Sequence, residues 1–406
     1  MGGTNQTPMG YRMTRTGALT LEHVHSRKNF LASPPISARK SPGTPCFRVK
    51  QKEPPDMYAQ VVDEADIQYA HRVDRKALAA ITREMSKVNN GRALWAMAAQ
   101  WLVIAAAFAF VLFVDRWWAW PVAAVLIATR QHALLALMHE AAHYHLLSNR
   151  KVSDVVSDLL CAFPLNMTTA GYRHEHMLHH RYVNTPKDPY LAGQLVDASW
   201  HFPRTPMRAT AVFLADALGL YAPNHLKVVL PWTYWGRLVG RAQPRISAGE
   251  HLRYWLYVAT LVTVLVTTGA WLHWLLLWVL PTTTVMMAFF RMRALGEHPI
   301  EETKSGDETR ETRDILGTAL ENFFIAPLNV NLHLTHHAFP SVPFYNLPAM
   351  HAQLDKAGLL EDGVNQFDTY LGKENSLIQY LTREPEASAA AAAAAQPSRL
   401  SQPLHS

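Results

Sequence analysis

Long apolar runs constrain the fold of this 406-residue chain more than any other feature. Residues 94–114 contain one polar side chain, Gln100. A helix over this run is about 31 Å long at about 1.5 Å per residue, which matches the hydrocarbon core of a bilayer. A second run, residues 117–138, follows a short turn at Asp115 and Arg116. The two runs predict a helical hairpin across a membrane.

A second apolar block, residues 254–290, is too long for one crossing and long enough for two. Gly269 and Trp271 mark a turn inside it, so we expect spans at 254–270 and 272–290. The predicted fold class is therefore all-α and integral to the membrane, with four transmembrane helices in two hairpins. Residues 152–165 and 209–222 are apolar but short or interrupted by charge, and we predict interfacial or re-entrant helices there.

Basic residues flank the hairpins on one side. Arg92, Arg150, Lys151 and Arg291 lie at the outer ends of the runs, whereas the first turn carries only Arg116. The positive-inside rule places these ends, and hence both termini, in the cytosol. Everything outside the two hairpins then forms a cytosolic helical cap.

Both ends of the chain differ in composition from the middle. Residues 1–52 contain nine Lys or Arg and one acid, which gives this segment a net charge of +8. Because the whole chain carries +6, the other residues together carry −2 and provide no basic surface for a nucleic acid. We expect residues 1–56 to be a disordered basic tail, with a targeting role, or an extension upstream of a start at Met57. Residues 57–383 form the predicted domain, and the alanine-rich residues 384–406 a low-complexity tail.

Histidines cluster in the cytosolic cap. His139 and His143 form an H-x-x-x-H pair at the end of the second span, and two H-x-x-H-H triplets follow in the chain. Spacings of three and four place side chains on one face of a helix, so each motif can direct imidazoles toward a common point. Imidazole is a good ligand for iron, zinc or copper. A single pair arises readily by chance, but two triplets on the same side of a membrane do not.

The sequence around these histidines resembles the membrane fatty acid desaturase superfamily. The segments HRYVNTPKDPY from His180, RMRALGEHP from Arg291 and NLHLTHHAFPSVPFYNLPAMH from Asn331 are similar to the bacterial branch that contains rhizobitoxine desaturase-like proteins. The resemblance covers residues 94–354. It implies a non-haem di-iron centre that activates O2, with metal ligands at His139, His143, His176, His179, His180, His298, His333, His336 and His337. His174 adds another histidine to the second motif and leaves its register open.

The number of donors independently favours two metal ions. Two irons with four or five protein ligands each need eight to ten donors, whereas a catalytic zinc needs about three. Asp188 and Glu297 are candidates for carboxylates that orient the imidazoles, with a turn residue and a helix-end acid as the alternatives. Asn329 and Asn331 are candidates for holding a metal-bound water, or for local turn hydrogen bonds.

The predicted function is that of a membrane-bound, O2-dependent di-iron oxidase that introduces a double bond into a fatty acyl or acyl-like chain. A hydroxylase or ketolase of the same superfamily, acting on a lipid, a carotenoid or a small amphipathic molecule, stays open. An intramembrane zinc protease is an alternative of another class, because HEAAH matches a zincin motif with Glu140 as general base. A metal carrier or sensor is a third alternative, although both leave the ordered triplets poorly explained.

Reduction of O2 needs electrons that this chain has no group to supply. The two cysteines, Cys46 and Cys161, are too few for a cysteine-ligated zinc or iron–sulfur cluster, and the sequence has no cytochrome domain or nucleotide-binding glycine loop. We therefore expect a separate ferredoxin, rubredoxin or cytochrome with its reductase as partner. Arg150, Lys151 and Arg181 are candidate docking points for an acidic carrier.

Overall fold

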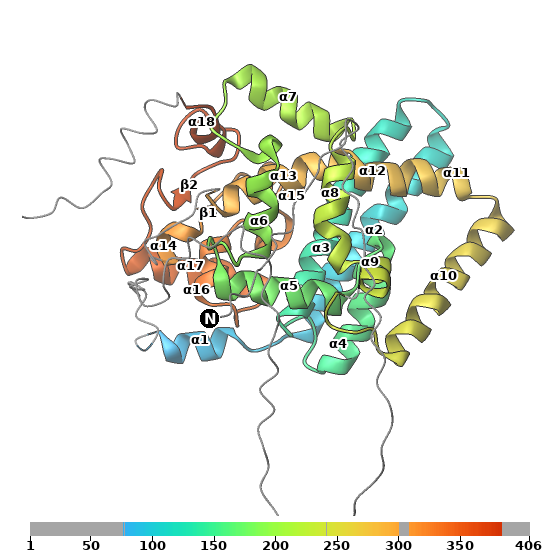
Figure 1. The fold of residues 1–406 in the computed structure, drawn as a ribbon, viewed down its shortest axis with the longest axis horizontal. Helices are drawn as coiled ribbons and strands as arrows, with labels where there is room; N and C mark the ends of the chain where they lie inside the picture. The colour runs from blue at the N-terminus through green and yellow to red at the C-terminus, as the bar shows by residue number, and fades with distance from the viewer. Residues whose placement is uncertain (1–75, 77, 241, 300–307, 384–406) are drawn as a thin grey trace, which may run out of the picture. The chain divides into compact units, whose positions relative to one another are not determined.

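The computed structural model describes residues 76, 78–240, 242–299 and 308–383, all of which belong to the compact unit Tyr58–Ser406. The two predicted tails, residues 1–56 and 384–406, lie outside the described residues. Helices dominate the described chain (Figure 1). The strands β1 (Asp314–Ile315) and β2 (Gln366–Phe367) are short and pair in parallel.

Helices α2 (Asn90–Val114) and α3 (Ala119–Ala142) form an antiparallel pair at the centre of the fold. The buried residues of α2 recur every three or four positions, which makes a single stripe that faces α3. Small side chains such as Ala93, Ala107 and Ala123 are fully or almost fully buried in this contact and let the backbones approach closely. The opposite face of α2 leaves Trp95, Leu102 and Phe113 exposed, as a lipid-facing surface requires.

Three helical segments of the described residues are long and apolar enough to cross a membrane: Asn90–Val114, Ala119–Ala142 and Trp271–Glu297. The third consists of α11 (Trp271–Trp274), the π-helical η6 (Leu275–Val279), α12 (Leu280–Thr283) and α13 (Val285–Glu297). Thr284 departs from helical geometry, with φ −126° and ψ −98°, and separates α12 from α13.

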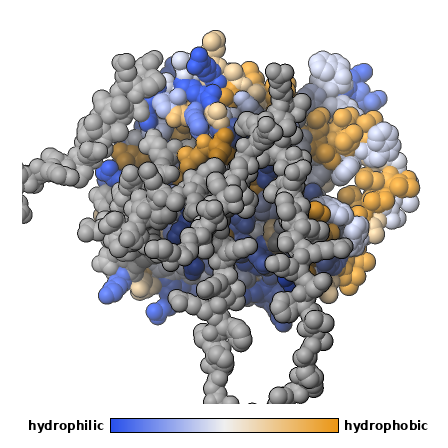
Figure 2. Space-filling view, in the orientation of Figure 1, coloured by the Kyte–Doolittle hydropathy of each residue, from blue (hydrophilic) through white to orange (hydrophobic). Residues whose placement is uncertain are grey.

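The predicted third span, residues 254–270, corresponds to α10 (Ala248–Thr268), which is long enough to cross a membrane but is not apolar enough to be counted with these three segments. Its first turns carry Glu250 and Arg253, which pair with Arg237 and Asp158, so its apolar part starts near Tyr254. The helix ends at Gly269, whose φ of 68° is costly for other residue types. Figure 2 shows apolar side chains at the right of the view, where Figure 1 places α10 and α11.

The remaining elements surround these helices. Before α10 they are α1 (Ala79–Met85), α4 (Arg150–Ser157), η2 (Asp158–Ala162), η3 (Phe163–Leu165), α5 (Thr169–Tyr182), α6 (Pro189–Val196), η4 (Ala198–Trp200), α7 (Pro206–Ala217), α8 (Ala222–Val229), η5 (Leu230–Trp232) and α9 (Tyr234–Gly240). After α13 they are α14 (Glu308–Glu311), α15 (Ala319–Phe324), η7 (Pro327–Asn329), α16 (His333–Ala338), η8 (Phe344–Asn346), α17 (Leu347–Lys356) and α18 (Leu377–Thr382). Both α5 and α13 pack on α3, which brings the ends of distant segments together.

Candidate metal centre

The nine histidines singled out in the sequence converge into two groups. In each group the candidate ligand atoms lie within 4.8 Å of one another. The first group has five members and the second has four: His139, His143, His176, His180 and His336, then His179, His298, His333 and His337.

Helix geometry explains how each triplet divides between the groups. Successive residues of an α-helix are turned by about 100°, so neighbours in the chain point in different directions while residues four apart share a face. In α5, His176 and His180 belong to the first group and His179 to the second. In α16 the division is reversed, because His333 and His337 belong to the second group and His336 to the first. Each triplet therefore serves both groups.

The ring nitrogens are spaced as ligands of one ion. In the first group, His176 Nε2 lies 2.9 Å from His143 Nε2 and 3.0 Å from His180 Nε2, which is 3.1 Å from His336 Nε2. Around an octahedral ion with bonds of about 2.1 Å, neighbouring donors are about 3.0 Å apart. A neutral ring nitrogen carries one proton or one lone pair and cannot make good hydrogen bonds to two such neighbours. The donor set therefore fits a shared cation.

Burial keeps these imidazoles neutral. It lowers the pKa of the histidines outside the apolar spans, and the neighbouring histidines lower it further. The pKa of His298 falls to about 3 for the same reasons. A neutral imidazole has a free lone pair, which metal binding requires. The histidines concerned are His143, His176, His180, His298, His333, His336 and His337.

Carboxylates and a carbonyl hold the far nitrogens of the second group. His179 Nδ1 lies 3.0 Å from both oxygens of the buried Asp188. Burial is the largest single influence and acts to raise the pKa of Asp188, but hydrogen bonds from His179 and the Tyr190 backbone, together with electrostatic interactions with His179 and His298, outweigh it and the pKa is lowered. His298 Nδ1 donates to the Glu311 carbonyl at 3.0 Å. Glu297 Oε1 lies 3.4 Å from His333 Nδ1 and 3.3 Å from Arg293 Nε, so it faces His333 and not its chain neighbour, although it forms no hydrogen bond among the described residues. Such contacts fix ring orientation.

Glu140 supports the first group in a similar position. Its Oε1 lies 3.5 Å from His139 Nδ1, and its Oε2 accepts a hydrogen bond from the backbone of Phe344 at 3.0 Å. Both histidines of HEAAH belong to a five-member group, whereas a zincin uses this pair with a free glutamate. Glu140 thus lies beside His139 and holds the Phe344 backbone, without a hydrogen bond to the imidazole among the described residues.

Other predicted residues lie outside the two groups. The amide nitrogens of Asn329 and Asn331 donate to the backbone carbonyls of Phe344 and Ile315, so both stabilise loops. His174 is in neither group, which leaves His176, His179 and His180 as the converging members of the second motif. His132 packs edge-on against Phe290, and neither of its ring nitrogens has a hydrogen-bond partner among the described residues.

The sequence analysis missed the aromatic residues around the histidines. The Tyr190 ring stacks on His179 with 4.4 Å between centroids, and its hydroxyl lies 3.3 Å from His176 Nδ1. The Tyr172 hydroxyl lies 3.4 Å from the same atom. Tyr172 precedes His176 by four residues on α5, so helical spacing was a usable signal. The place of Tyr190 depends on how α6 packs and had no such signal.

An apolar cavity of about 110 Å³ reaches both histidine groups. Apolar side chains such as Leu135, Met138, Met167, Met287 and Phe290 line it, together with His139, His176, His179, His298, His333 and His336. The cavity therefore offers a mainly apolar space beside the candidate metal ligands.

Comparison with known proteins agrees with this geometry. A family model described as fatty acid desaturase matches residues 115–370, which include all nine histidines. The chain is 27% identical over 277 residues to the dihydrorhizobitoxine desaturase of Bradyrhizobium elkanii, covering 66% of this chain and 77% of that protein. It is 24% identical over 264 residues to the chloroplastic omega-6 fatty acid desaturase of Glycine max, covering 61% of this chain and 59% of that protein.

Proposed function

Because this chain belongs to the fatty acid desaturase family, we propose that it is a membrane-bound, O2-dependent di-iron oxidoreductase that introduces a double bond into a fatty acyl or acyl-like chain. The observation that carries the proposal is the convergence of five and four histidines at the end of one apolar cavity. Both relatives are named as desaturases, one of dihydrorhizobitoxine and one of fatty acid.

In this proposal each histidine group holds one iron, through five imidazoles in the first group and four in the second. Asp188 and Glu297 orient His179 and His333 through their Nδ1 atoms, so that Nε2 faces the ion. When bound, the iron pair supplies the O2 chemistry that oxidises an unactivated C–H bond. The protein positions the substrate, because apolar walls hold a chain beside the ligands and exclude water.

A contact within the second group supports four membrane crossings. The rings of His179 and His298 lie 4.7 Å apart, so both residues are on one side of a membrane. The segment Trp271–Glu297 lies between them in the chain, and a single crossing there would separate them. A second crossing at α10 makes the number of crossings between them even, so that both residues lie on the same side. We place both hairpin openings, the histidines and both termini in the cytosol, on the basis of the flanking basic residues.

A separate electron donor completes the proposed reaction. A ferredoxin, rubredoxin or cytochrome with its reductase delivers electrons at the cytosolic face. Arg150, Lys151 and Arg181 are exposed on the histidine side of the proposed topology and offer positive charge to an acidic carrier.

The test is expression in a bacterial host together with a compatible donor and reductase, followed by mass spectrometry of the fatty acids and of other apolar metabolites. We expect a new double bond that is absent when His337→Ala is expressed at the same level. An oxygenated product with unchanged unsaturation would replace the desaturase proposal with a hydroxylase of the same family.

A further inference from the structure

A second pocket, of about 500 Å³, opens next to the histidine cavity. Residues of α5, α6, α8 and η5 line it. Tyr190, Val228 and Trp232 line both the pocket and the cavity, so the two lie next to each other and share these side chains. The outer pocket is therefore placed as a route from the surface to the histidines.

The outer pocket contains one acid and one base that have no partner among the described residues. Glu175 on α5 is half-buried, Lys227 on α8 is exposed, and neither forms a hydrogen bond or an ion pair within the described parts of the chain. Asp197, by contrast, accepts hydrogen bonds from the Ser199 backbone and the Asn224 side chain. A partly buried charge without a counter-charge is costly, and a ligand of complementary charge removes the cost.

Building on the proposed function, we propose that the outer pocket binds the polar end of the substrate and that this end is zwitterionic. Its ammonium group pairs with Glu175 and its anionic group with Lys227. The apolar chain passes between Tyr190 and Trp232 into the cavity and reaches the histidines. The substrate class is an amphipathic molecule with both charges close together at one end, such as an α-amino acid with a long side chain or an aminophospholipid.

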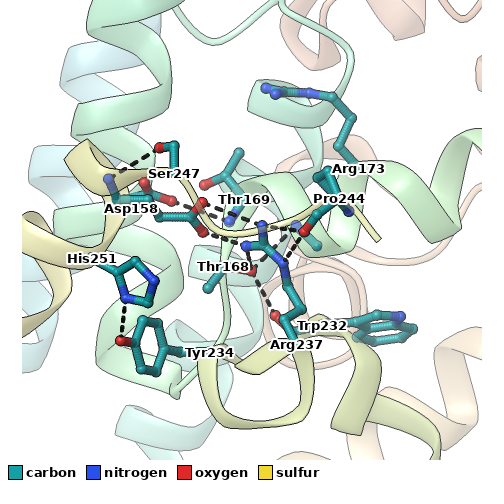
Figure 3. A network of polar contacts seen from close by, with 12 residues as sticks. Asp158, Thr168, Thr169, Arg173, Trp232, Tyr234, Arg237, Pro244, Ser247 and His251 are labelled. Atoms are coloured by element: carbon teal, nitrogen blue, oxygen red, sulfur yellow. Dashed lines mark hydrogen bonds and ion pairs between the residues drawn. The ribbon is translucent and has the colours of Figure 1, made fainter. Parts of the chain in front are cut away.

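The wall between pocket and cavity is held by a buried polar network (Figure 3). The backbone and hydroxyl of Thr168 donate to the Trp232 carbonyl at 2.8 and 2.9 Å. Arg237 donates to the Thr168 hydroxyl at 2.8 Å and forms a buried ion pair with Glu250. With its backbone fixed, the Trp232 ring packs against Tyr190 at 5.5 Å between centroids. The passage is thus bounded by positioned rings.

Gly193 on α6 provides a way to close the pocket without touching the histidines. A Cβ at this position meets the Val228 side chain at 3.5 Å, which is ordinary van der Waals contact. Gly193→Ala therefore fits, whereas Gly193→Phe fills the space between α6 and α8. The alanine variant is the matched control for the phenylalanine variant.

Binding of three amphiphiles with the same chain length tests the charge assignment. The iron-loaded protein in lipid nanodiscs is titrated with α-aminohexadecanoic acid, hexadecanoic acid and hexadecylamine, with empty nanodiscs as background. We expect the zwitterion to bind about tenfold tighter than either singly charged analogue. Lys227→Gln reduces its affinity to that of the amine, and Glu175→Gln to that of the acid. Lys356→Gln, an exposed change on α17, leaves the order unchanged.

Two further measurements show whether the zwitterion is a membrane lipid or a free small molecule. They also distinguish a failure of the zwitterion proposal from a failure of the proposed function. Higher occupancy in phosphatidylethanolamine than in phosphatidylglycerol nanodiscs assigns the site to a lipid, and a preference limited to the free amphiphile assigns it to a small molecule. Gly193→Phe should lose binding at unchanged iron content, while Gly193→Ala keeps it. Equal affinity for the three amphiphiles, or an order that the charge variants do not change, overturns the zwitterion proposal. Absence of iron or of any double bond would count against the proposed function instead, whatever the binding order.

Discussion

At the scale of single residues, adjacent histidines have different partners. His179 and His180 follow one another on α5, and His336 and His337 on α16, yet each pair is divided between the two groups. Successive residues of an α-helix are rotated by about 100°, so adjacent histidines can face different groups. The α5 triplet gives two histidines to the first group and one to the second, and the α16 triplet gives one to the first and two to the second. Loss of one imidazole therefore removes a donor from one group and disturbs the helix that supplies the other.

The first prediction concerns metal content. The protein purified in detergent should contain two irons per chain, and His176→Ala, His179→Ala, His336→Ala or His337→Ala should lower the content of both, because each helix supports both groups. Elemental analysis by mass spectrometry measures this directly. One zinc per chain, with peptidase activity that depends on Glu140, would contradict the di-iron proposal.

The second prediction concerns the carboxylate behind His179. Asp188→Asn should lower iron affinity or activity by about 10- to 100-fold, because an amide is a weaker acceptor for the Nδ1 proton. Asparagine still caps α6 by accepting from the Tyr190 backbone. It loses the second carboxylate oxygen, which accepts from the Asn184 backbone, so the metal-free protein should lose only about 1–3 kcal/mol of stability. Asp355→Asn, on an exposed part of α17, is the control and should change neither quantity. A large drop in thermal stability would show that Asp188 acts through the fold.

At the scale of elements, the helices that carry the histidines are anchored by polar contacts at their ends. Thr168 caps α5 by accepting from the Gly171 backbone, and Arg237 links this cap to α10 through Glu250. Gly171 leaves no space for a side chain, since a Cβ there lies 2.7 Å from both the Arg237 and Thr168 side chains. The start of α5, and hence the direction of His176, depends on this packing.

The third prediction tests that anchor. Arg237→Met leaves Glu250 buried without its partner and should destabilise the protein by about 3–5 kcal/mol. The double variant Arg237→Met with Glu250→Leu should recover part of this loss, because no charge is left buried. The midpoint of unfolding in a denaturing detergent measures both. If the double variant were as unstable as the single one, the loss would come from packing and not from the unpaired charge.

At the scale of the whole molecule, membrane crossing and site assembly depend on each other. The second group takes His179 from before α10 and three histidines from after α13. These residues meet only if the chain between them crosses the membrane an even number of times. The topology is therefore a condition for the site.

The fourth prediction follows from this parity. Reporter fusions at Leu195, at Leu316 and at the C-terminus should all give the cytosolic signal, since the proposed crossings at α10 and Trp271–Glu297 return the chain to its starting side. A periplasmic signal at Leu316 alone would mean that one of these two segments does not cross, and would contradict the four-span topology.

Local periodicity made several features predictable from sequence alone. The helical character of the chain and the three apolar segments follow from the length of apolar runs, and the eight histidines of the three motifs follow from spacing along a helix, which are properties of neighbouring residues. His298 was implied only by the resemblance to the family. The same helical spacing could have identified Tyr172, which lies four residues before His176 on α5. The predicted span at residues 254–270 was harder to judge, because charged residues that form ion pairs in the fold occupy the first turns of α10.

Tertiary structure alone decided which distant residues meet. Spacing could not assign His336 to the first group and His337 to the second, direct Glu297 to His333, or place Tyr190 against His179. It also gave no sign that Glu175 and Lys227 share a pocket. Such pairs are separated by tens of residues or lie on helices whose mutual rotation is set by packing. Their contacts therefore depend on the whole fold and are not encoded in any local pattern.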